Sequence, residues 1–274
     1  MKFLLVIFCA CLSITALMPE QSPDMLLVKG GTFYMGSNTE QPDEKPVHEV
    51  TLRDFYIGKK EVTVAEWKIF AQAVKKAMPE KPNWTLEDNF PMVYVGWTDA
   101  IEYCNWMSAK DKLTPCYKIT KAANSYQVTC NFLANGYRLP TEAEWEFAAR
   151  GGTHSRSFVY SGSNDINQVA YYGYNSDNKP HPVGQLKANE IGLFDMSGNA
   201  WEWVWDFYDN KYYTTSPSVN PTGPAKSLYR CLRGGSLLRN ASSCRSTSRY
   251  FGIWLNFRGN SNGFRIARTS VTPK

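Results

Sequence analysis

The sequence predicts a mixed α+β fold with little regular secondary structure, and three observations predict it. Nineteen Gly and fifteen Pro among 274 residues favour loops over a helical bundle. Residues 25–37 and 49–57 alternate as strands do, whereas residues 63–75 place apolar side chains at helical spacing. Nine Trp and sixteen Tyr supply enough material for one sizeable core.

The expected elements follow one another along the chain. Residues 25–37 predict a strand, a tight turn and a second strand, and residues 49–57 predict a further strand. Thr63 is the expected N-cap of a helix over residues 63–75. Residues 92–97 predict a strand, after which Thr98 begins a helix that carries Cys104 on one face. Thr141 with Glu144 forms a capping box for a helix that stops at Gly151.

The N-terminus reads as an export signal. A basic start and an apolar run fill residues 1–17, and the run is too short to span a bilayer as a helix. Cys11 follows the small residue Ala10, as at a bacterial lipoprotein cleavage site; cleavage near Ala16 is the alternative. Residues 18–24 are polar and contain Pro, as expected of a tether. We therefore expect an exported protein on the cell surface, lipid-anchored to a bacterial outer membrane.

A single domain is expected over residues 25–270, with an insertion at residues 108–136. The insertion contains two short strand candidates around a polar tip, which predicts a hairpin. The hairpin would bring Cys116 and Cys130 close together. In an exported protein these two residues are disulfide candidates, and such a bond stabilises by about 3 kcal/mol.

Charge is unevenly distributed. The net charge is +5, yet no Asp or Glu follows Asp209, where Arg is frequent. The C-terminal part either attracts anionic surfaces or uses its Arg side chains as structural partners of carbonyls and carboxylates. No nucleic-acid-binding module is present, and no nucleic-acid partner is expected.

Two acidic motifs each have a functional and a structural interpretation. Glu142, Glu144 and Glu146 open a helix, where carboxylates complement the helix dipole more often than they catalyse. Further on, Asp195 and Glu202 with the carbonyls of Gly198 and Ala200 predict a hard-cation site. The alternative for that second motif is that both carboxylates accept hydrogen bonds from turn amides.

The C-terminal segment from residue 233 to residue 267 is bracketed by two glycine-bearing anchors. These are Arg233-Gly234-Gly235-Ser236 and Gly263-Phe264-Arg265. Residues 237–261 between them, here called the contact segment, follow neither a helical nor a strand period. Residues 250–257 are too aromatic for an ordinary loop. They form either an exposed recognition surface or a buried run.

Several motifs together resemble the formylglycine-generating enzyme, or sulfatase-modifying factor, family. Besides the two anchors they are Val28-Lys29-Gly30-Gly31-Thr32-Phe33-Tyr34-Met35-Gly36, Val93-Tyr94-Val95-Gly96-Trp97-Thr98-Asp99-Ala100, Arg138-Leu139-Pro140-Thr141-Glu142-Ala143-Glu144-Trp145-Glu146, and Gly192-Leu193-Phe194-Asp195-Met196-Ser197-Gly198-Asn199-Ala200-Trp201-Glu202-Trp203. The resemblance covers about residues 25–268. It implies a decorated C-type-lectin fold and structural calcium at Asp195, Gly198, Ala200 and Glu202.

The family's oxidase activity is not expected here. In the enzymes a cysteine three residues after the Arg-Gly-Gly-Ser anchor works with a second cysteine, and the pair binds copper. This chain has Arg239 at the first position, so we expect no copper and no catalytic residue. Cys104 and Cys244 are a structural pair or two buried thiols, and Cys231 belongs to the core. A formylglycine-generating oxidoreductase remains the alternative. A mononuclear iron oxidase is disfavoured, because the three histidines (His48, His154 and His181) lie in unrelated loops.

A closer resemblance is to the variable proteins of diversity-generating retroelements, a non-catalytic branch of the same fold. In these proteins the segment between the anchors is diversified and binds a ligand. Large aromatic and small polar side chains suit such a surface. The implied contact residues are Leu238, Arg239, Ser242, Ser243, Ser248, Tyr250, Phe251, Ile253, Trp254, Leu255, Phe257, Asn260 and Ser261. The expected partner is a protein or glycan of a host or neighbouring cell, bound by a monomer.

Overall fold

A computed structural model describes residues 23–79, 84–122, 125–252 and 257–270. Three α-helices are described: α1 Val64–Ala73, α2 Trp97–Lys110 and α3 Glu142–Ala149. The strands are β1 Met25–Val28, β2 Gly31–Met35, β3 His48–Leu52, β4 Phe55–Gly58, β5 Tyr117–Ala122, β6 Ser125–Cys130, β7 Tyr137–Arg138, β8 Trp201–Phe207, β9 Arg230–Arg233, β10 Arg249–Gly252, β11 Asn262–Gly263 and β12 Ala267–Thr269. The predicted α+β class is confirmed.

The strands form two four-stranded sheets and two two-stranded ribbons within the described residues. The sheet orders are β1-β4-β12-β7 and β10-β9-β8-β11, and the ribbons are β2-β3 and β5-β6. The strand–turn–strand pattern at Gly30 predicts a hairpin, but β1 and β2 do not pair with each other. Instead β1 pairs with β4 and β2 pairs with β3, so the chain passes between sheets at this glycine. A Cβ on Gly30 would lie 2.2 Å from the carbonyl oxygen of Leu52, which leaves no room for another residue.

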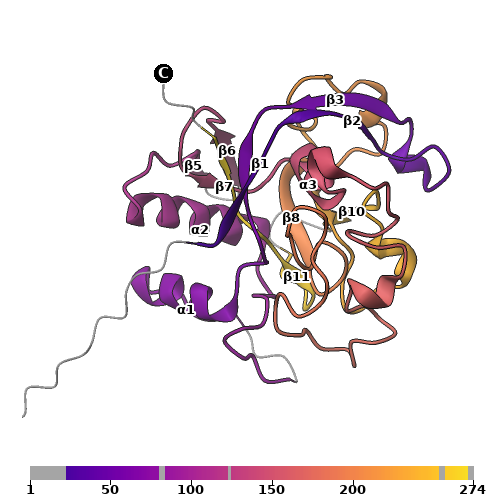
Figure 1. The fold of residues 1–274 in the computed structure, drawn as a ribbon. Helices are drawn as coiled ribbons and strands as arrows, with labels where there is room; N and C mark the ends of the chain where they lie inside the picture. Colours follow the sequence, from indigo (N-terminus) through magenta and orange to yellow (C-terminus); the bar gives the residue numbers. More distant parts are fainter. Residues whose placement is uncertain (1–22, 80–83, 123–124, 253–256, 271–274) are drawn as a thin grey trace, which may run out of the picture.

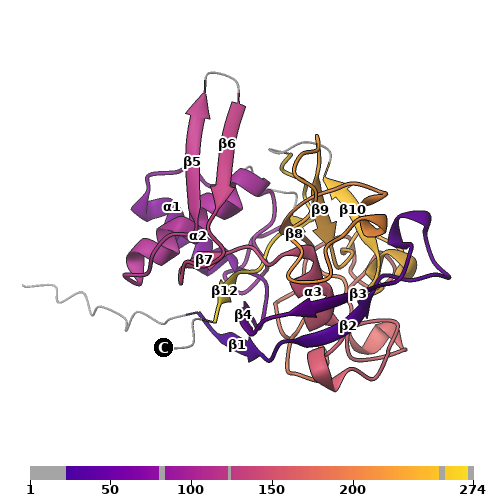
Figure 2. The same cartoon turned by 90° about the horizontal axis from the view of Figure 1, so that it is seen from above.

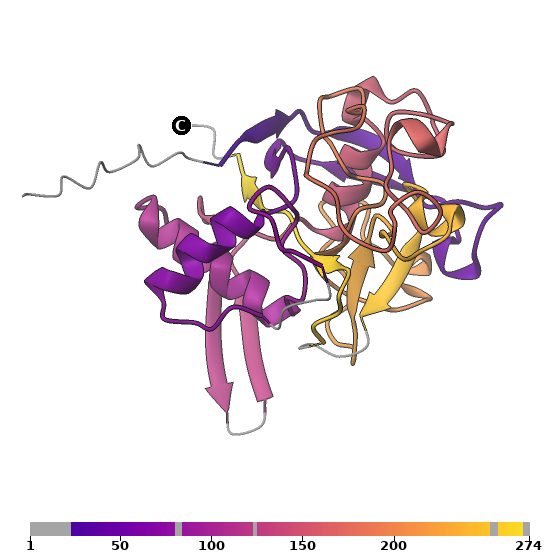
Figure 3. The same cartoon turned by 90° about the horizontal axis from the view of Figure 1, so that it is seen from below.

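The sheet that contains β8 separates two hydrophobic cores. Successive strand residues point to opposite faces, so Trp203 packs into one core and Val204 into the other. Leu232 and Cys231 of β9 divide in the same way. The first core is built largely on α1 and α2, the second on α3 and β1–β4. Figures 1 and 3 show the purple helices α1 and α2 on one side of the molecule and the orange strand β8 on the other.

Helix starts follow local chemistry, with one correction. Thr63 and Thr141 both form the predicted capping boxes, with Glu66 and Glu144 as reciprocal partners. Residues 92–97 are not a strand, although they form a short apolar run as a buried strand would, and the backbone of Tyr94 is left-handed with φ of 60°. Helix α2 begins at Trp97 and not after Thr98, because the Asp99 carboxylate accepts the Gly96 amide at 2.8 Å.

The predicted hairpin is present, but its predicted disulfide is not. Strands β5 and β6 pair antiparallel and project from the body (Figure 2). Cys116 and Cys130 are both free thiols. The register pairs Cys130 with Tyr117 and so offsets the two cysteines by one residue. The Cys116 thiol instead donates to the carbonyl of Gly136 at 3.3 Å.

Among the described residues no helix has both the length and the apolarity required to cross a membrane.

Candidate ligand-contact surface

The first anchor and the middle of the contact segment are fixed by buried ion pairs to α3. Arg233 lies with one guanidinium nitrogen 2.5 Å from Glu146, and Arg249 contacts Glu142 at 2.7 and 2.9 Å. Arg233 also donates to the backbone carbonyls of Ser246 and Ser248. The helix therefore holds both the start and the middle of this segment from the inside.

The glutamates of α3 thus do more than complement the helix dipole. Each of the three carboxylates forms an ion pair with a buried arginine. Glu144 pairs with Arg138 at 2.6 and 2.7 Å. Burial by itself would raise the pKa of Glu142. The charges of Arg249 and Arg233 outweigh it and lower this pKa to about 2. All three carboxylates are structural partners, which agrees with the structural interpretation of the frequent C-terminal arginines.

The two glycines of the first anchor have conformations that other residues rarely adopt. Gly234 and Gly235 have φ of 97° and 76°. A Cβ on Gly235 would lie 2.5 Å from the sulfur of Cys244, so the backbone turns closely over that thiol. Burial raises the pKa of Cys244 to about 12, which makes it a packed and unreactive thiol.

Arg265 of the second anchor pairs with Glu202, which is the carboxylate that a calcium ion would need. The Arg265 guanidinium contacts both Glu202 oxygens at 2.6 Å, and Trp145 donates its indole N–H to the same carboxylate at 2.7 Å. Asp195 accepts the amide of Gly184 at 2.6 Å. No cluster of three or more His, Cys, Asp or Glu side chains suited to a metal occurs in the described part of the chain.

The expected calcium site therefore does not fit this arrangement. Glu202 neutralises the buried Arg265 guanidinium, and the Asp195 carboxylate is engaged separately with the Gly184 amide. Asp195 accepts a hydrogen bond from a turn amide, as the alternative interpretation predicted. Glu202 instead forms an ion pair with Arg265.

A buried carboxyl cluster that the sequence did not reveal supports this anchor. Glu61 is 2% exposed and contacts Asn199 and the Ala200 amide. Burial, and then the nearby charges of Asp195 and Glu202, raise the pKa of Glu61 well above its ordinary value. Burial also raises the pKa of Asp195, to about 6. Nothing local marks Glu61, because its partners lie more than 130 residues away.

Most of the predicted contact residues that are described reach the surface. Leu238, Phe251 and Phe257 are 39–40% exposed. Arg239 and Ser242 are exposed, whereas Ser243, Tyr250 and Asn260 are partly exposed. Ile253, Trp254 and Leu255 lie outside the described residues.

Two predicted contact residues are wrong. Ser248 and Ser261 are buried, at 6% and 8% exposure. The carbonyl of Ser248 accepts from Arg233, and that of Ser261 accepts the Trp201 amide at 2.7 Å. Both serines therefore fix the backbone and do not face a ligand.

Tyr250 lies at the centre of an aromatic surface cluster. Its ring stacks on Trp201 and on Phe251, each with centroids 5.1 Å apart. The Arg239 guanidinium lies 4.9 Å from the same ring and donates to the Tyr250 hydroxyl at 3.2 Å. Trp201 is buried beneath this cluster, whereas Phe251 is 39% exposed.

Residues outside the contact segment extend this surface. Tyr208 and Tyr229 lie 5.6 and 5.4 Å from the Phe251 ring. The amide of Gly173 donates to the Arg239 carbonyl at 2.8 Å, which places the exposed Tyr174 beside the segment. No motif of the sequence marked Tyr208 or Tyr229 as part of this surface.

Cys104 and Cys244 are not paired with each other in the described part of the chain. Cys104 and Cys244 are free and buried and belong to different hydrophobic clusters, so the structural-pair alternative is wrong and the buried-thiol alternative is confirmed. Cys231 lies in the core as predicted, where its thiol donates to Glu142 at 3.0 Å.

Comparison with known proteins gives consistent relatives. A model for the sulfatase-modifying factor enzyme 1-like domain matches residues 14–270. Chaperone protein LppX of Paenibacillus barcinonensis is 37% identical, over 90% of this chain and 90% of its own length. The formylglycine-generating enzyme of Streptomyces coelicolor is 28% identical, over 93% of this chain and 86% of its own. Treponema denticola variable protein 1 is 32% identical, with a TM-score of 0.79 and coverage of 89% and 94%.

Proposed function

Because the chain belongs to the sulfatase-modifying factor enzyme 1-like family and yet carries Arg239 where the enzymes' first cysteine is expected, we propose that it is a non-catalytic binding protein. Its contact segment is the ligand surface. One observation carries the proposal: the Tyr250–Phe251 cluster is partly in solvent while the same strand is fixed internally through Arg249. Rigid aromatic side chains on an immobile backbone lose little entropy on binding.

The chemistry of the thiols supports a non-catalytic role. Copper(I) in the family's enzymes needs two thiolates, and the thiolate is the form that binds soft metals. Cys244 is the remaining cysteine of the contact segment, and its pKa is raised to about 12. Arg239 is instead engaged with Tyr250. A formylglycine-generating activity would require a different ligand set.

We propose a protein as the ligand, in preference to a glycan. The aromatic cluster and the excess of basic over acidic residues in the C-terminal part suit a protein surface with acidic groups. The relative that is named a chaperone favours a second candidate, in which the same surface holds partly folded chains. Diversification of the contact segment is a separate proposal. It requires a near-copy of the coding segment that differs at adenines, beside a reverse transcriptase gene.

We further propose that the chain is an exported lipoprotein, lipidated at Cys11 and tethered by residues 18–24 to the outer membrane, and that it acts as a monomer. Globomycin, which blocks lipoprotein signal cleavage, tests the first point, since it would leave the precursor uncleaved. Cleavage near Ala16 would instead continue in its presence.

Site-specific photo-crosslinking tests the binding function directly. A photoreactive phenylalanine at Phe251 should give a discrete crosslinked species on intact cells. The same group at Leu133, which is 75% exposed on the insertion, is the matched control and should give none. Suppression of aggregation of a heat-denatured test enzyme would favour the chaperone candidate. Copper-dependent turnover of a sulfatase-motif peptide would overturn the non-catalytic proposal.

A further inference from the structure

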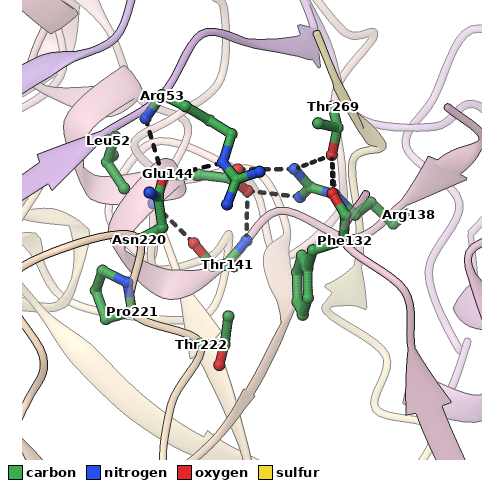
Figure 4. Close-up of a pocket in the computed structure, with 10 residues that line it drawn as sticks. All are labelled: Leu52, Arg53, Phe132, Arg138, Thr141, Glu144, Asn220, Pro221, Thr222 and Thr269. Atoms are coloured by element: carbon green, nitrogen blue, oxygen red, sulfur yellow. Dashed lines mark hydrogen bonds and ion pairs between the residues drawn. The ribbon is translucent and has the colours of Figure 1, made fainter. Parts of the chain in front are cut away.

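A small polar cavity lies outside the contact segment, at the start of α3. Its volume is about 180 Å³. It brings together the end of β3, the start of α3, the end of β12 and a loop after residue 217 (Figure 4). Its polar lining residues are Arg53, Arg138, Thr141, Glu144, Asn220, Thr222 and Thr269.

The cavity wall is held in place by backbone hydrogen bonds. The amide of Asn220 donates to the Thr51 carbonyl at 2.9 Å, and the Asn220 side-chain oxygen accepts the Arg53 amide at 2.9 Å. The same oxygen accepts from Arg53 Nε at 3.3 Å. These contacts fix both the loop and the base of the Arg53 side chain at the cavity.

The one carboxylate in the cavity has no capacity left for a cationic ligand. Glu144 accepts two hydrogen bonds from Arg138 and a third from the Thr141 amide at 2.9 Å. Arg138 is in turn used by Glu144, Thr269 and the Leu139 carbonyl. The buried half of the cavity is therefore an internally satisfied ion pair.

The groups that remain are hydrogen-bond donors. Arg53 and Thr222 are both exposed, and among the described residues no hydrogen bond engages the two terminal guanidinium nitrogens of Arg53 or the hydroxyl of Thr222. Two guanidinium groups against one carboxylate leave an excess of one positive charge. A planar guanidinium with both outer nitrogens free matches the two oxygens of a carboxylate or phosphate.

We propose that this cavity binds a small oxyanion, a carboxylate or a phosphate group, through Arg53 with help from Thr222. The cavity is too small for a drug-sized molecule. It therefore fits an anionic group at the end of a chain or a free small anion. This site is independent of the contact segment and would be present whether or not that segment binds a protein.

NMR on the full chain tests the proposal. The side-chain Nε–H resonance of Arg53 is assigned by its loss in Arg53→Gln, and acetate, phosphate and chloride are titrated separately at constant ionic strength. The resonance should shift saturably with acetate or phosphate and not with chloride. The stronger of the two oxyanions identifies the ligand class. Thr222→Val should weaken the interaction by about tenfold, the effect of losing one charge-assisted hydrogen bond.

Matched variants keep the result interpretable. Arg156→Gln removes an exposed arginine elsewhere and should leave the oxyanion titration unchanged. Circular dichroism melts check that Arg53→Gln and Thr222→Val remain folded. Equal shifts with chloride and with both oxyanions, or unchanged titration in Thr222→Val, would overturn the site.

Discussion

Arg249 and Glu142 meet through two parallel hydrogen bonds, from Nε at 2.7 Å and from Nη2 at 2.9 Å, although they are 107 residues apart. Both side chains are buried, while the next two residues after Arg249 form the aromatic surface. One strand thus has an inward side chain that fixes it and outward side chains that are available to a ligand. The division explains how a fold can tolerate an exchangeable surface.

Breaking this pair should strongly destabilise the protein. Arg249→Ala leaves the Glu142 charge buried without its bidentate partner. Removal of one member of a buried ion pair costs about 3–5 kcal/mol. The free energy of unfolding from urea titration measures the loss. Arg239→Ala removes an exposed arginine of the same segment as the control, and it should change that free energy by about 0.5 kcal/mol or less. Equal effects of the two variants would contradict the anchoring role.

Asp195 should make stability fall as pH rises towards neutrality. Its pKa is raised from 3.8 to about 6 in the folded protein, so the folded state binds the proton more tightly than the unfolded state. The contribution is fully present below pH 3.8 and is lost as pH rises through 6. Asp195→Asn keeps an acceptor for the Gly184 amide without this titration. Its stability relative to the wild type should therefore increase between pH 4 and pH 7.

Urea titrations of both proteins at several pH values measure this difference. Lys60→Gln, which removes a nearby charge that lowers the pKa of Asp195, should enhance the pH dependence. A stability difference that stays constant over this pH range would show that Asp195 does not titrate in the expected window.

Calcium should not stabilise the protein through the Glu202 motif. Both Glu202 oxygens already accept from Arg265, and a bound cation would have to displace that guanidinium. Thermal melts with EDTA and with millimolar calcium are expected to coincide. A saturable rise of the melting temperature with calcium, absent in Glu202→Gln, would restore the metal site.

Gly235 should be intolerant of a methyl group for two separable reasons. Its φ of 76° disfavours other residues, and the added Cβ would approach the Cys244 sulfur to 2.5 Å. Strain of the backbone costs roughly 1–2 kcal/mol, and overpacking adds about 1–3 kcal/mol. Gly192→Ala is the matched control, because its φ is 88° but nothing lies within 4 Å of the new atom.

Denaturant unfolding of both alanine variants should therefore show the larger loss at Gly235. Cys244→Ala in the Gly235→Ala background should recover part of that loss, since it removes the sulfur that clashes. If Gly192→Ala were as costly as Gly235→Ala, backbone strain would account for both and the close contact would be unimportant.

Local chemistry made the helices and the hairpin predictable. Thr63 and Thr141 each have their capping partner three residues away, so these helix starts are determined within one turn. The strand prediction for residues 92–97 was wrong because this apolar run packs into a core without pairing with another strand. The turn at Gly30 was recognised, but its strands pair with β4 and β3, which only tertiary packing decides.

The site was predictable in outline and not in detail. Anchor motifs located the contact segment, and Arg239, Tyr250 and Phe251 lie on its surface as expected. Ser248 and Ser261 could not be separated from exposed serines, because their burial depends on carbonyl contacts with Arg233 and Trp201. Sequence reasoning likewise could not pair Glu202 with Arg265, because Arg265 lies 63 residues further along the chain.

The exposed contact residues should be exchangeable without loss of the fold. Leu238→Ser, Ser242→Tyr and Phe257→Ser alter side chains that lie in solvent, and each should change the free energy of unfolding by about 0.5 kcal/mol or less. Effects at separated positions add, so the triple variant should remain within about 1.5 kcal/mol of the wild type. The buried Ser248→Tyr, a serine-to-tyrosine change in the same segment, should cost clearly more than Ser242→Tyr because it must displace packed atoms around Arg233. The free energy of unfolding from urea titration distinguishes exposed residues from residues that stabilise the fold. A triple variant as unstable as Arg249→Ala would mean that the exposed residues also stabilise the fold.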